Sequence, residues 1–145
     1  MILLSWRDEY RVGVEQIDTE HRFLFALINE FHDSYQGGRS KRDLLQVLQR
    51  LVAYAEQHFQ NEEALMAASE YPRLEGHHGL HEKLVASIFE LNESLSTHEG
   101  SVNAATLRFL KNWLLDHIIV EDMAFGDFLK RRKATSDSDV ESSPD

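Results

Sequence analysis

Seven side chains that can bind metal ions recur along this sequence at helical spacing. Five are histidines and two are carboxylates: His21, His58, Glu62, His77, His81, His117 and Asp122. His58 and Glu62 are four residues apart, as are His77 and His81, so each pair lies on one face of an α-helix. Seven donors exceed the four that a tetrahedral zinc site takes. The set fits a pair of octahedral transition-metal ions that share carboxylates.

Each of these histidines, taken alone, could be an ordinary core residue with a hydrogen-bonded ring. Five such histidines and Glu62 would then each need a separate buried partner, because an unpaired polar group in an apolar core is costly. Metal binding satisfies all of them at once. We therefore favour metal ligation over a metal-free structural bundle.

The composition of the set indicates the metal and its ligand. Two octahedral ions with five imidazoles, two bridging carboxylates and one bridging oxo or hydroxo group have a single coordination position left over. One open position on a redox-active pair suits one small diatomic ligand. Imidazole nitrogen with few carboxylates suits iron or copper better than magnesium or calcium. The mixed set resembles known di-iron sites, so we predict two iron ions that alternate between Fe2+ and Fe3+.

Apolar residues at intervals of three and four predict four helices that carry these ligands. The first helix is expected to begin near Asp18 or Thr19, which are good N-caps, and to end at Gly37. Ser40 is expected to cap the second helix. Pro72 suits the first turn of the third helix.

The fourth helix is expected to follow a break at Gly100, with Ser101 as its cap. On a regular helix, residues five apart such as His117 and Asp122 are about 140° apart. We therefore predict a local widening between them, of the π-bulge kind that is frequent at functional sites. A regular helix here would exclude Asp122 as a ligand and make Glu121 the nearer candidate.

Short connections between four helices predict an all-α fold, an antiparallel up-down-up-down four-helix bundle. Residues 1–17 are expected to form an extended N-terminal arm, and the polar, acidic segment from Ala134 onward a disordered tail. The expected organisation is one di-iron domain, residues 1–133, followed by a disordered tail, residues 134–145. The length of 145 residues is enough for one domain with a substantial core.

The composition argues against several other classes of protein. A net charge of −10 disfavours nucleic-acid binding, which requires a basic surface. The basic run 130–133 is interpreted as cations that offset the negative end of the last helix. Cysteine is absent, which excludes disulfides and thiolate metal sites. The apolar start is too short for a signal peptide and no segment is long enough for membrane insertion, so we expect a soluble, cytoplasmic protein.

Four segments, taken together with their order and spacing, resemble the bacterial members of the hemerythrin family, which are non-haem di-iron proteins. These segments are Val14-Glu-Gln-Ile-Asp-Thr-Glu-His21, His58-Phe-Gln-Asn-Glu62, Tyr71-Pro72 leading into His77-His-Gly-Leu-His81, and Trp113-Leu-Leu-Asp-His117-Ile-Ile-Val-Glu-Asp122. The similarity runs from about Trp6 to about Leu129 and fills all seven ligand positions.

The resemblance implies roles for the ligands. One iron would be held by three histidines: His77, His81 and His117. The other would be held by His21 and His58, with its sixth position open, and Glu62 and Asp122 would bridge the two ions. The implied function is reversible dioxygen binding for oxygen storage, transport or delivery, without catalysis. An oxygen-consuming enzyme is an expected partner, and the polar outer faces allow a monomer.

Two other functions fit the same ligand set. One is a di-iron enzyme such as an oxidase, a peroxidase or a nitric oxide reductase, and the other is an oxygen-sensing or iron-sensing module. Neutral imidazoles stabilise high-valent iron less well than additional carboxylates do. The inner helix faces carry no acid or base beyond the ligands themselves. Both observations favour binding over catalysis.

The resemblance also implies that apolar and aromatic neighbours of the ligands wall the open site: Leu24, Phe59, Trp113, Leu114 and Ile118. The alternative is that these residues are simply core. Three further histidines are not expected to be ligands. His32 is interpreted as a residue at the edge of the core, His78 as exposed, and His98 as lying at the end of a helix.

Overall fold

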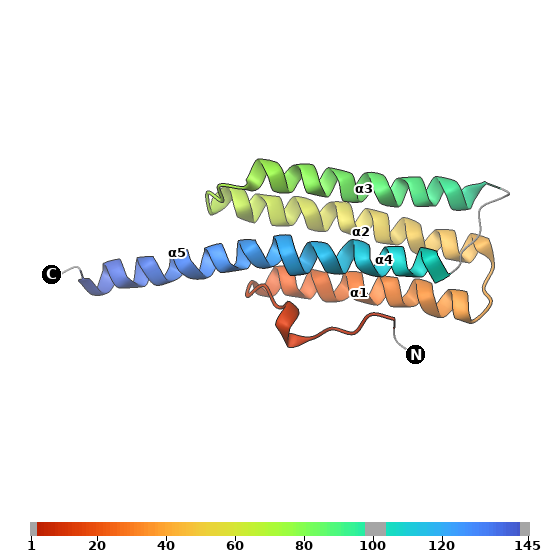
Figure 1. Ribbon diagram of the computed structural model, residues 1–145, viewed down its shortest axis with the longest axis horizontal. Coiled ribbons are helices and arrows are strands. Elements are labelled where there is room, and N and C mark those ends of the chain that lie inside the picture. The colour runs from red at the N-terminus through yellow and green to blue at the C-terminus, as the bar shows by residue number, and fades with distance from the viewer. Residues whose placement is uncertain (1–2, 98–103, 143–145) are drawn as a thin grey trace.

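Figure 1 shows the computed structural model, which describes the backbone of residues 3–97 and 104–142 and their side chains other than 119 and 134–142. The elements in chain order are η1 (Asp8–Tyr10), α1 (Glu15–Gln36), α2 (Lys41–Ala68), α3 (Leu74–Ser96), α4 (Ala104–His117), η2 (Ile118–Asp122) and α5 (Met123–Ser142). The short segment η2 joins α4 and α5 without a break, so these elements form one long rod. Four rods lie side by side along the long axis (Figure 1), which confirms the predicted all-α antiparallel bundle.

Local signals set several helix ends as predicted. Gly37 ends α1, and the side chain of Ser40 caps α2 by accepting the backbone N–H of Asp43 at 3.2 Å. The expected break at Gly100 and cap at Ser101 lie outside the described residues.

Two predicted helix starts are wrong. Helix α1 begins at Glu15, ahead of the expected caps Asp18 and Thr19, which both lie inside the helix. Helix α3 begins at Leu74, so Pro72 belongs to the preceding turn and not to the first turn of the helix. The carboxylate of Asp18 is engaged elsewhere, by the backbone of the N-terminal arm.

The N-terminal arm is fixed to α1 through its backbone. The N–H of Leu4 donates to Oδ1 of Asn29 at 2.9 Å, and the carbonyl of Leu4 accepts from Nδ2 of Asn29 at 2.8 Å. The buried Asp18 carboxylate accepts the N–H groups of Val12 at 2.7 Å and Gly13 at 3.2 Å. Gly13 has φ +99°, a backbone conformation that residues other than glycine rarely adopt. The arm therefore lies along the bundle ahead of α1 (Figure 1), as predicted, but it includes the short helix η1 and ends at residue 14 instead of the expected residue 17.

The core consists of two apolar clusters with a polar layer between them. The larger cluster fills most of the bundle, and the smaller one contains Met66, Tyr71 and Phe125. Along α2, Glu62 lies between Phe59 of the larger cluster and Met66 of the smaller one. The seven predicted ligands thus occupy one level of the bundle, between the two apolar clusters.

Helix α5 projects past the ends of the other helices (Figure 1). The sequence favours disorder from Ala134 onward, and the structure carries the helical backbone through part of this tail to Ser142. A helix that is already formed propagates at little cost, which accounts for the extension. The tail lies outside the bundle, and the domain boundary at residues 133 and 134 stays a prediction. Among the described residues, no helix is long and apolar enough to cross a membrane.

Gly126 in α5 packs directly against the arm, because a Cβ at this position would lie 2.4 Å from the backbone oxygen of Val12. We predict that Gly126→Ala displaces the arm and lowers the free energy of unfolding by about 1–3 kcal/mol, the usual cost of overpacking. Urea unfolding of the variant and the parent protein measures this difference.

Gly79→Ala in α3 is the matched control, since an added Cβ there meets no atom within 4 Å. This substitution is expected to raise the free energy of unfolding by roughly 0.5–1 kcal/mol, because alanine suits a helix interior better than glycine does. A Gly126→Ala variant as stable as the parent would contradict the proposed packing of the arm.

Candidate metal centre

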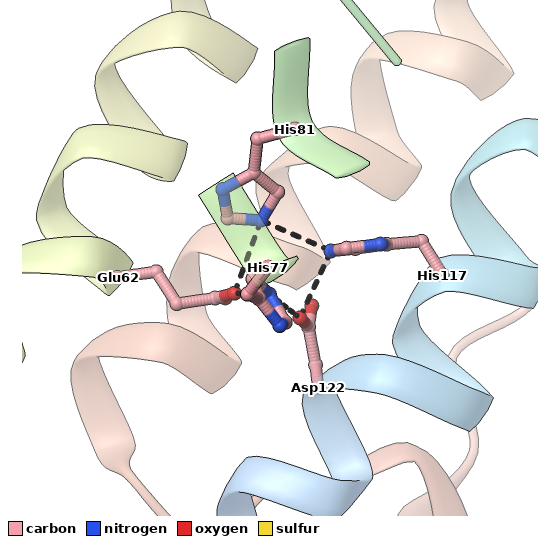
Figure 2. A group of neighbouring side chains, drawn as sticks. All are labelled: Glu62, His77, His81, His117 and Asp122. Carbon is pink, nitrogen blue, oxygen red and sulfur yellow. Dashed lines mark hydrogen bonds and ion pairs between the residues drawn. The ribbon is translucent and has the colours of Figure 1, made fainter. Parts of the chain in front are cut away.

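Every rod of the bundle contributes side chains to one buried cluster. Helix α1 supplies His21, α2 supplies His58 and Glu62, α3 supplies His77 and His81, and the rod formed by α4, η2 and α5 supplies His117 and Asp122. None of the seven side chains is more than 6% exposed. Figure 2 shows the side chains from α2, from α3 and from the rod of α4, η2 and α5 converging on one another: Glu62, His77, His81, His117 and Asp122. The structure therefore brings together every residue that the sequence singles out as a potential ligand.

Asp122 reaches the cluster because the helix widens just ahead of it. Residues Ile118–Asp122 form a π-helix that begins directly after His117. Nε2 of His117 lies 3.0 Å from Oδ1 of Asp122, whereas a regular helix would hold the two residues about 140° apart. The predicted widening is confirmed. Glu121, the alternative candidate, is not part of any group of potential ligands found among the described residues.

The donor atoms form two groups that share the two carboxylates. The larger group contains Glu62, His77, His81, His117 and Asp122, and the smaller contains His21, His58, Glu62 and Asp122. Glu62 turns one oxygen toward each group. Its Oε1 lies 2.7 Å from Nε2 of His77, and its Oε2 lies 3.3 Å from Nε2 of His58.

Asp122 is divided between the two groups in the same way. Its Oδ1 lies 3.0 Å from Nε2 of His117, and its Oδ2 lies 2.9 Å from Nε2 of His21. Within each group the donor atoms lie within 4.8 Å of one another. Two carboxylates that each face both groups can bridge a pair of cations.

Several buried ligand atoms lie close to one another but make no well-aligned hydrogen bond in the part of the chain that the structure describes. They include Nε2 of His21 and His58, Oε2 of Glu62 and both carboxylate oxygens of Asp122. Such atoms are costly to leave unsatisfied in a bundle core. A cation in each group would satisfy them, and imidazole with carboxylate oxygen is a donor set that suits iron. The residues present therefore fit a metal pair.

Most of the chain matches a single protein family. Residues 12–129 match the family described as the hemerythrin HHE cation binding domain. The chain belongs to the hemerythrin family. It is 31% identical over 130 residues to the bacteriohemerythrin of Methylococcus capsulatus, which covers 89% of this chain and 98% of that protein. It is also 31% identical over 113 residues to the myohemerythrin of Riftia pachyptila, covering 78% of this chain and 82% of that protein.

The fold is shared with solved hemerythrin structures. A crystal structure of wild-type hemerythrin superposes with a TM-score of 0.79 and 30% sequence identity, covering 86% of this chain and 96% of that chain. The resemblance drawn from the four sequence segments is thus confirmed.

Two carboxylates that sequence reasoning missed accept hydrogen bonds from two of the clustered histidines, on the ring nitrogen that faces away from the cluster. Nδ1 of His58 donates to Oε1 of Glu20 at 2.7 Å, and Nδ1 of His81 donates to Oε2 of Glu63 at 2.9 Å. A proton on Nδ1 leaves Nε2, the nitrogen that faces the cluster, free to ligate a cation. Both carboxylates lie off the apolar stripes, which is why periodicity does not reveal them. The available signal is that each directly adjoins a ligand in the sequence.

The metal-free cluster balances its charges with protons. Burial lowers the pKa of His21, but the adjacent carboxylates of Asp122 and Glu62 outweigh it and raise that pKa to about 9. The same balance raises the pKa of His77 to about 9. Burial raises the pKa of Asp122, and so does Glu62, but the neighbouring histidines His117 and His21 prevail and lower it to about 2. Protons thus occupy the positions that a metal ion would take.

The five residues expected to wall the open position are all buried in the larger apolar cluster: Leu24, Phe59, Trp113, Leu114 and Ile118. The ring of Phe59 stacks on His81, with centroids 4.0 Å apart, and lies 5.9 Å from the ring of His117. Nε1 of Trp113 donates to the carbonyl of Leu84 at 2.8 Å and so ties α4 to α3. Their role as a wall stays a prediction.

The remaining histidines lie where the sequence places them. His32 is 8% exposed at the edge of the core, and the His78 side chain is 54% exposed. Neither belongs to the two groups of potential ligands. His98 lies outside the described residues.

The raised pKa values of His21 and His77 predict that the metal-free protein loses stability as the pH rises. Their protonated forms stabilise the fold fully below the ordinary histidine pKa of 6.5, and this stabilisation disappears as the pH approaches about 9. We expect the free energy of unfolding to fall across this window by on the order of 3 kcal/mol for each histidine, since each pKa rises from 6.5 to about 9 and one pKa unit corresponds to about 1.4 kcal/mol. Urea unfolding at several pH values measures it.

The metal-loaded protein is the control for this prediction. A bound cation replaces the protons, so its stability is expected to hold or rise over the same window. The lowered pKa of Asp122 acts at the other end of the scale, because its stabilisation is present above pH 3.8 and is lost as the pH falls toward about 2. Metal-free protein that grows more stable between pH 6.5 and 9 would exclude this account of the cluster.

Proposed function

We propose that this hemerythrin domain binds dioxygen reversibly at two iron ions joined by an oxo or hydroxo group. The proposed ligands are the seven clustered residues His21, His58, Glu62, His77, His81, His117 and Asp122. Such an iron pair, by changing between Fe2+ and Fe3+, supplies the electrons that dioxygen binding requires. We place dioxygen at the iron with fewer histidines.

One observation carries this proposal: three histidines lie on one side of two shared carboxylates and only two lie on the other. Both metal positions share the same two carboxylates, but one has three imidazoles and the other has two. The two positions would therefore differ in coordination. The position near His21 and His58 has one nitrogen donor fewer. A difference of this kind supports binding of one small ligand at one ion.

The protein around the site supports binding over catalysis. Besides the seven clustered residues, the only buried polar or charged residues in the described part of the chain are Asp18 and His32. Asp18 is committed to the arm, where it accepts two backbone N–H groups. His32 lies about three helical turns beyond His21 on α1. Neither is placed to deliver a proton to a ligand at the cluster, which favours binding over catalysis.

We assign the apolar residues beside the cluster the task of keeping water out. Leu24, Leu114 and Ile118 are at most 2% exposed, and the aromatic rings of Phe59 and Trp113 lie 6.4 Å apart beside them in the same cluster. A dry wall slows the escape of reduced oxygen species, which would leave the irons oxidised. We further propose that the oxygen is stored or delivered to an oxygen-consuming enzyme by a cytoplasmic monomer.

The direct test is to reduce the iron-loaded protein without oxygen, admit oxygen, and record the visible spectrum. We expect an absorption band that develops on oxygenation and disappears when oxygen is removed, together with iron bound in pairs by metal analysis. Rapid and irreversible oxidation without such a band would favour a di-iron enzyme or a sensor. Protein that takes up almost no iron would overturn the site itself.

Leu114→Ala tests the apolar wall. We expect faster conversion to the fully oxidised protein with unchanged iron content, because the smaller side chain admits water. The cavity should also lower the free energy of unfolding by about 2–5 kcal/mol. Leu110→Ala, one turn earlier on α4 and also buried, is the matched control for lost stability alone. Equal oxidation rates in the two variants would remove Leu114 from the wall.

A further inference from the structure

Each group of the cluster contains one histidine whose outer nitrogen is held by a carboxylate. In the two-histidine group this is His58, held by Glu20, and in the three-histidine group it is His81, held by Glu63. Figure 2 shows the second ring nitrogen of His81 pointing away from the other ligands. The two carboxylates are therefore comparable in position, one behind a histidine of each group.

The surroundings of the two carboxylates differ. Glu20 is held by neutral amides, since its Oε2 accepts from Nδ2 of Asn61 at 2.9 Å and from Nε2 of Gln16 at 3.2 Å. Glu63 has no such amide partner in the described part of the chain. Its Oε1 is paired with Nδ1 of the neighbouring histidine His78, while its Oε2 accepts from His81.

His78 connects this pair to the outside of the molecule. Its second ring nitrogen lies 2.9 Å from Oε1 of Glu82, so each ring nitrogen of His78 faces a carboxylate and Nδ1 is placed to donate to Oε1 of Glu63. The His78 side chain is 54% exposed, and Glu63, His78 and His81 all line one groove between α2 and α3. A continuous chain of contacts thus runs from Glu82 at the surface to the cluster.

We propose that Glu63 is a positioning residue for His81 that couples the exposed His78 to the three-histidine metal, whereas Glu20 holds His58 with amide partners only. This inference rests on the proposed metal pair. A carboxylate behind a ligating imidazole orients the ring and raises its basicity, which favours the more highly charged metal. His78 contacts the same carboxylate, and this contact weakens the effect of Glu63 on the basicity of His81. Substitutions at the two positions should therefore act in opposite directions.

The first experiment measures Co2+ affinity, which does not depend on dioxygen. Glu63→Ala is expected to weaken one of the two binding steps by about 10–100-fold and to change the visible spectrum of Co2+, the usual result of removing such a partner. Glu63→Gln keeps an acceptor oxygen and should recover part of the loss. Glu20→Ala should weaken the other step. Thermal melting of each variant establishes that it is folded.

Glu56→Ala is the matched control, because Glu56 lies two turns earlier on α2 and lines the same groove. It makes no hydrogen bond to a histidine among the described residues. This variant should bind both ions like the parent protein. Glu63→Ala protein that binds Co2+ as tightly as Glu56→Ala protein would overturn the inference.

The second experiment measures the reduction potential of the iron-loaded protein by spectroelectrochemistry. Glu63→Ala should raise the potential, and His78→Ala should lower it, because the freed carboxylate then acts fully on His81. Lys83→Ala removes an exposed positive charge from the same helix α3 and serves as the control for charge alone. A His78→Ala shift that is upward, or no larger than that of Lys83→Ala, would overturn the coupling.

These outcomes are distinguishable from failure of the proposed function. If the parent protein binds no metal pair, or binds one without a reversible oxygen band, the proposed function fails. If the parent protein binds the pair and oxygen as expected while the Glu63 and His78 variants behave like their controls, only the coupling fails.

Discussion

Two buried carboxylates must be balanced by positive charge or hydrogen-bond donors, and the rest of the bundle is arranged to supply them. Glu62 and Asp122 are 0% exposed at the level where the four rods converge. Ionised carboxylates in such a place are stable only beside cations or strong hydrogen-bond donors. Without metal, the surrounding histidines supply positive charge, because the carboxylates of Asp122 and Glu62 raise the pKa of both His21 and His77 to about 9. With metal, the same nitrogens exchange protons for cations, so folding and metal uptake are linked.

The same requirement explains the irregularity of the fourth rod. A regular helix could present either His117 or Asp122 to the cluster, but not both, because residues five apart face different directions. The π-helix Ile118–Asp122 turns both side chains inward, and each carboxylate can then face both groups. The local geometry of this segment therefore serves the site.

Periodicity predicts the bundle and the seven clustered residues because both depend on which helix face is buried. It even predicts the widened segment, since a spacing of five cannot be reconciled with one face of a regular helix. It does not report which groups touch across helices. Periodicity does not identify Glu20 and Glu63, because they flank the apolar stripes and their roles depend on contacts with other helices. The sequence also misplaces the start of α1, because the Asp18 side chain, which is of a type that often caps helices, instead accepts a backbone N–H of the arm.

The placement of protons around the cluster bears on why such a site would bind a gas without transforming it. The carboxylates Glu20 and Glu63 lie behind their histidines, on the side away from the shared oxygens of Glu62 and Asp122. The residues proposed to wall the inner side belong to the larger apolar cluster and offer no acidic proton. Breaking the bond between two oxygen atoms consumes protons, whereas binding and release of dioxygen do not. Where the carboxylates beyond the cluster lie behind the histidines and the proposed wall is hydrocarbon, electron transfer to the gas would be free to run backward.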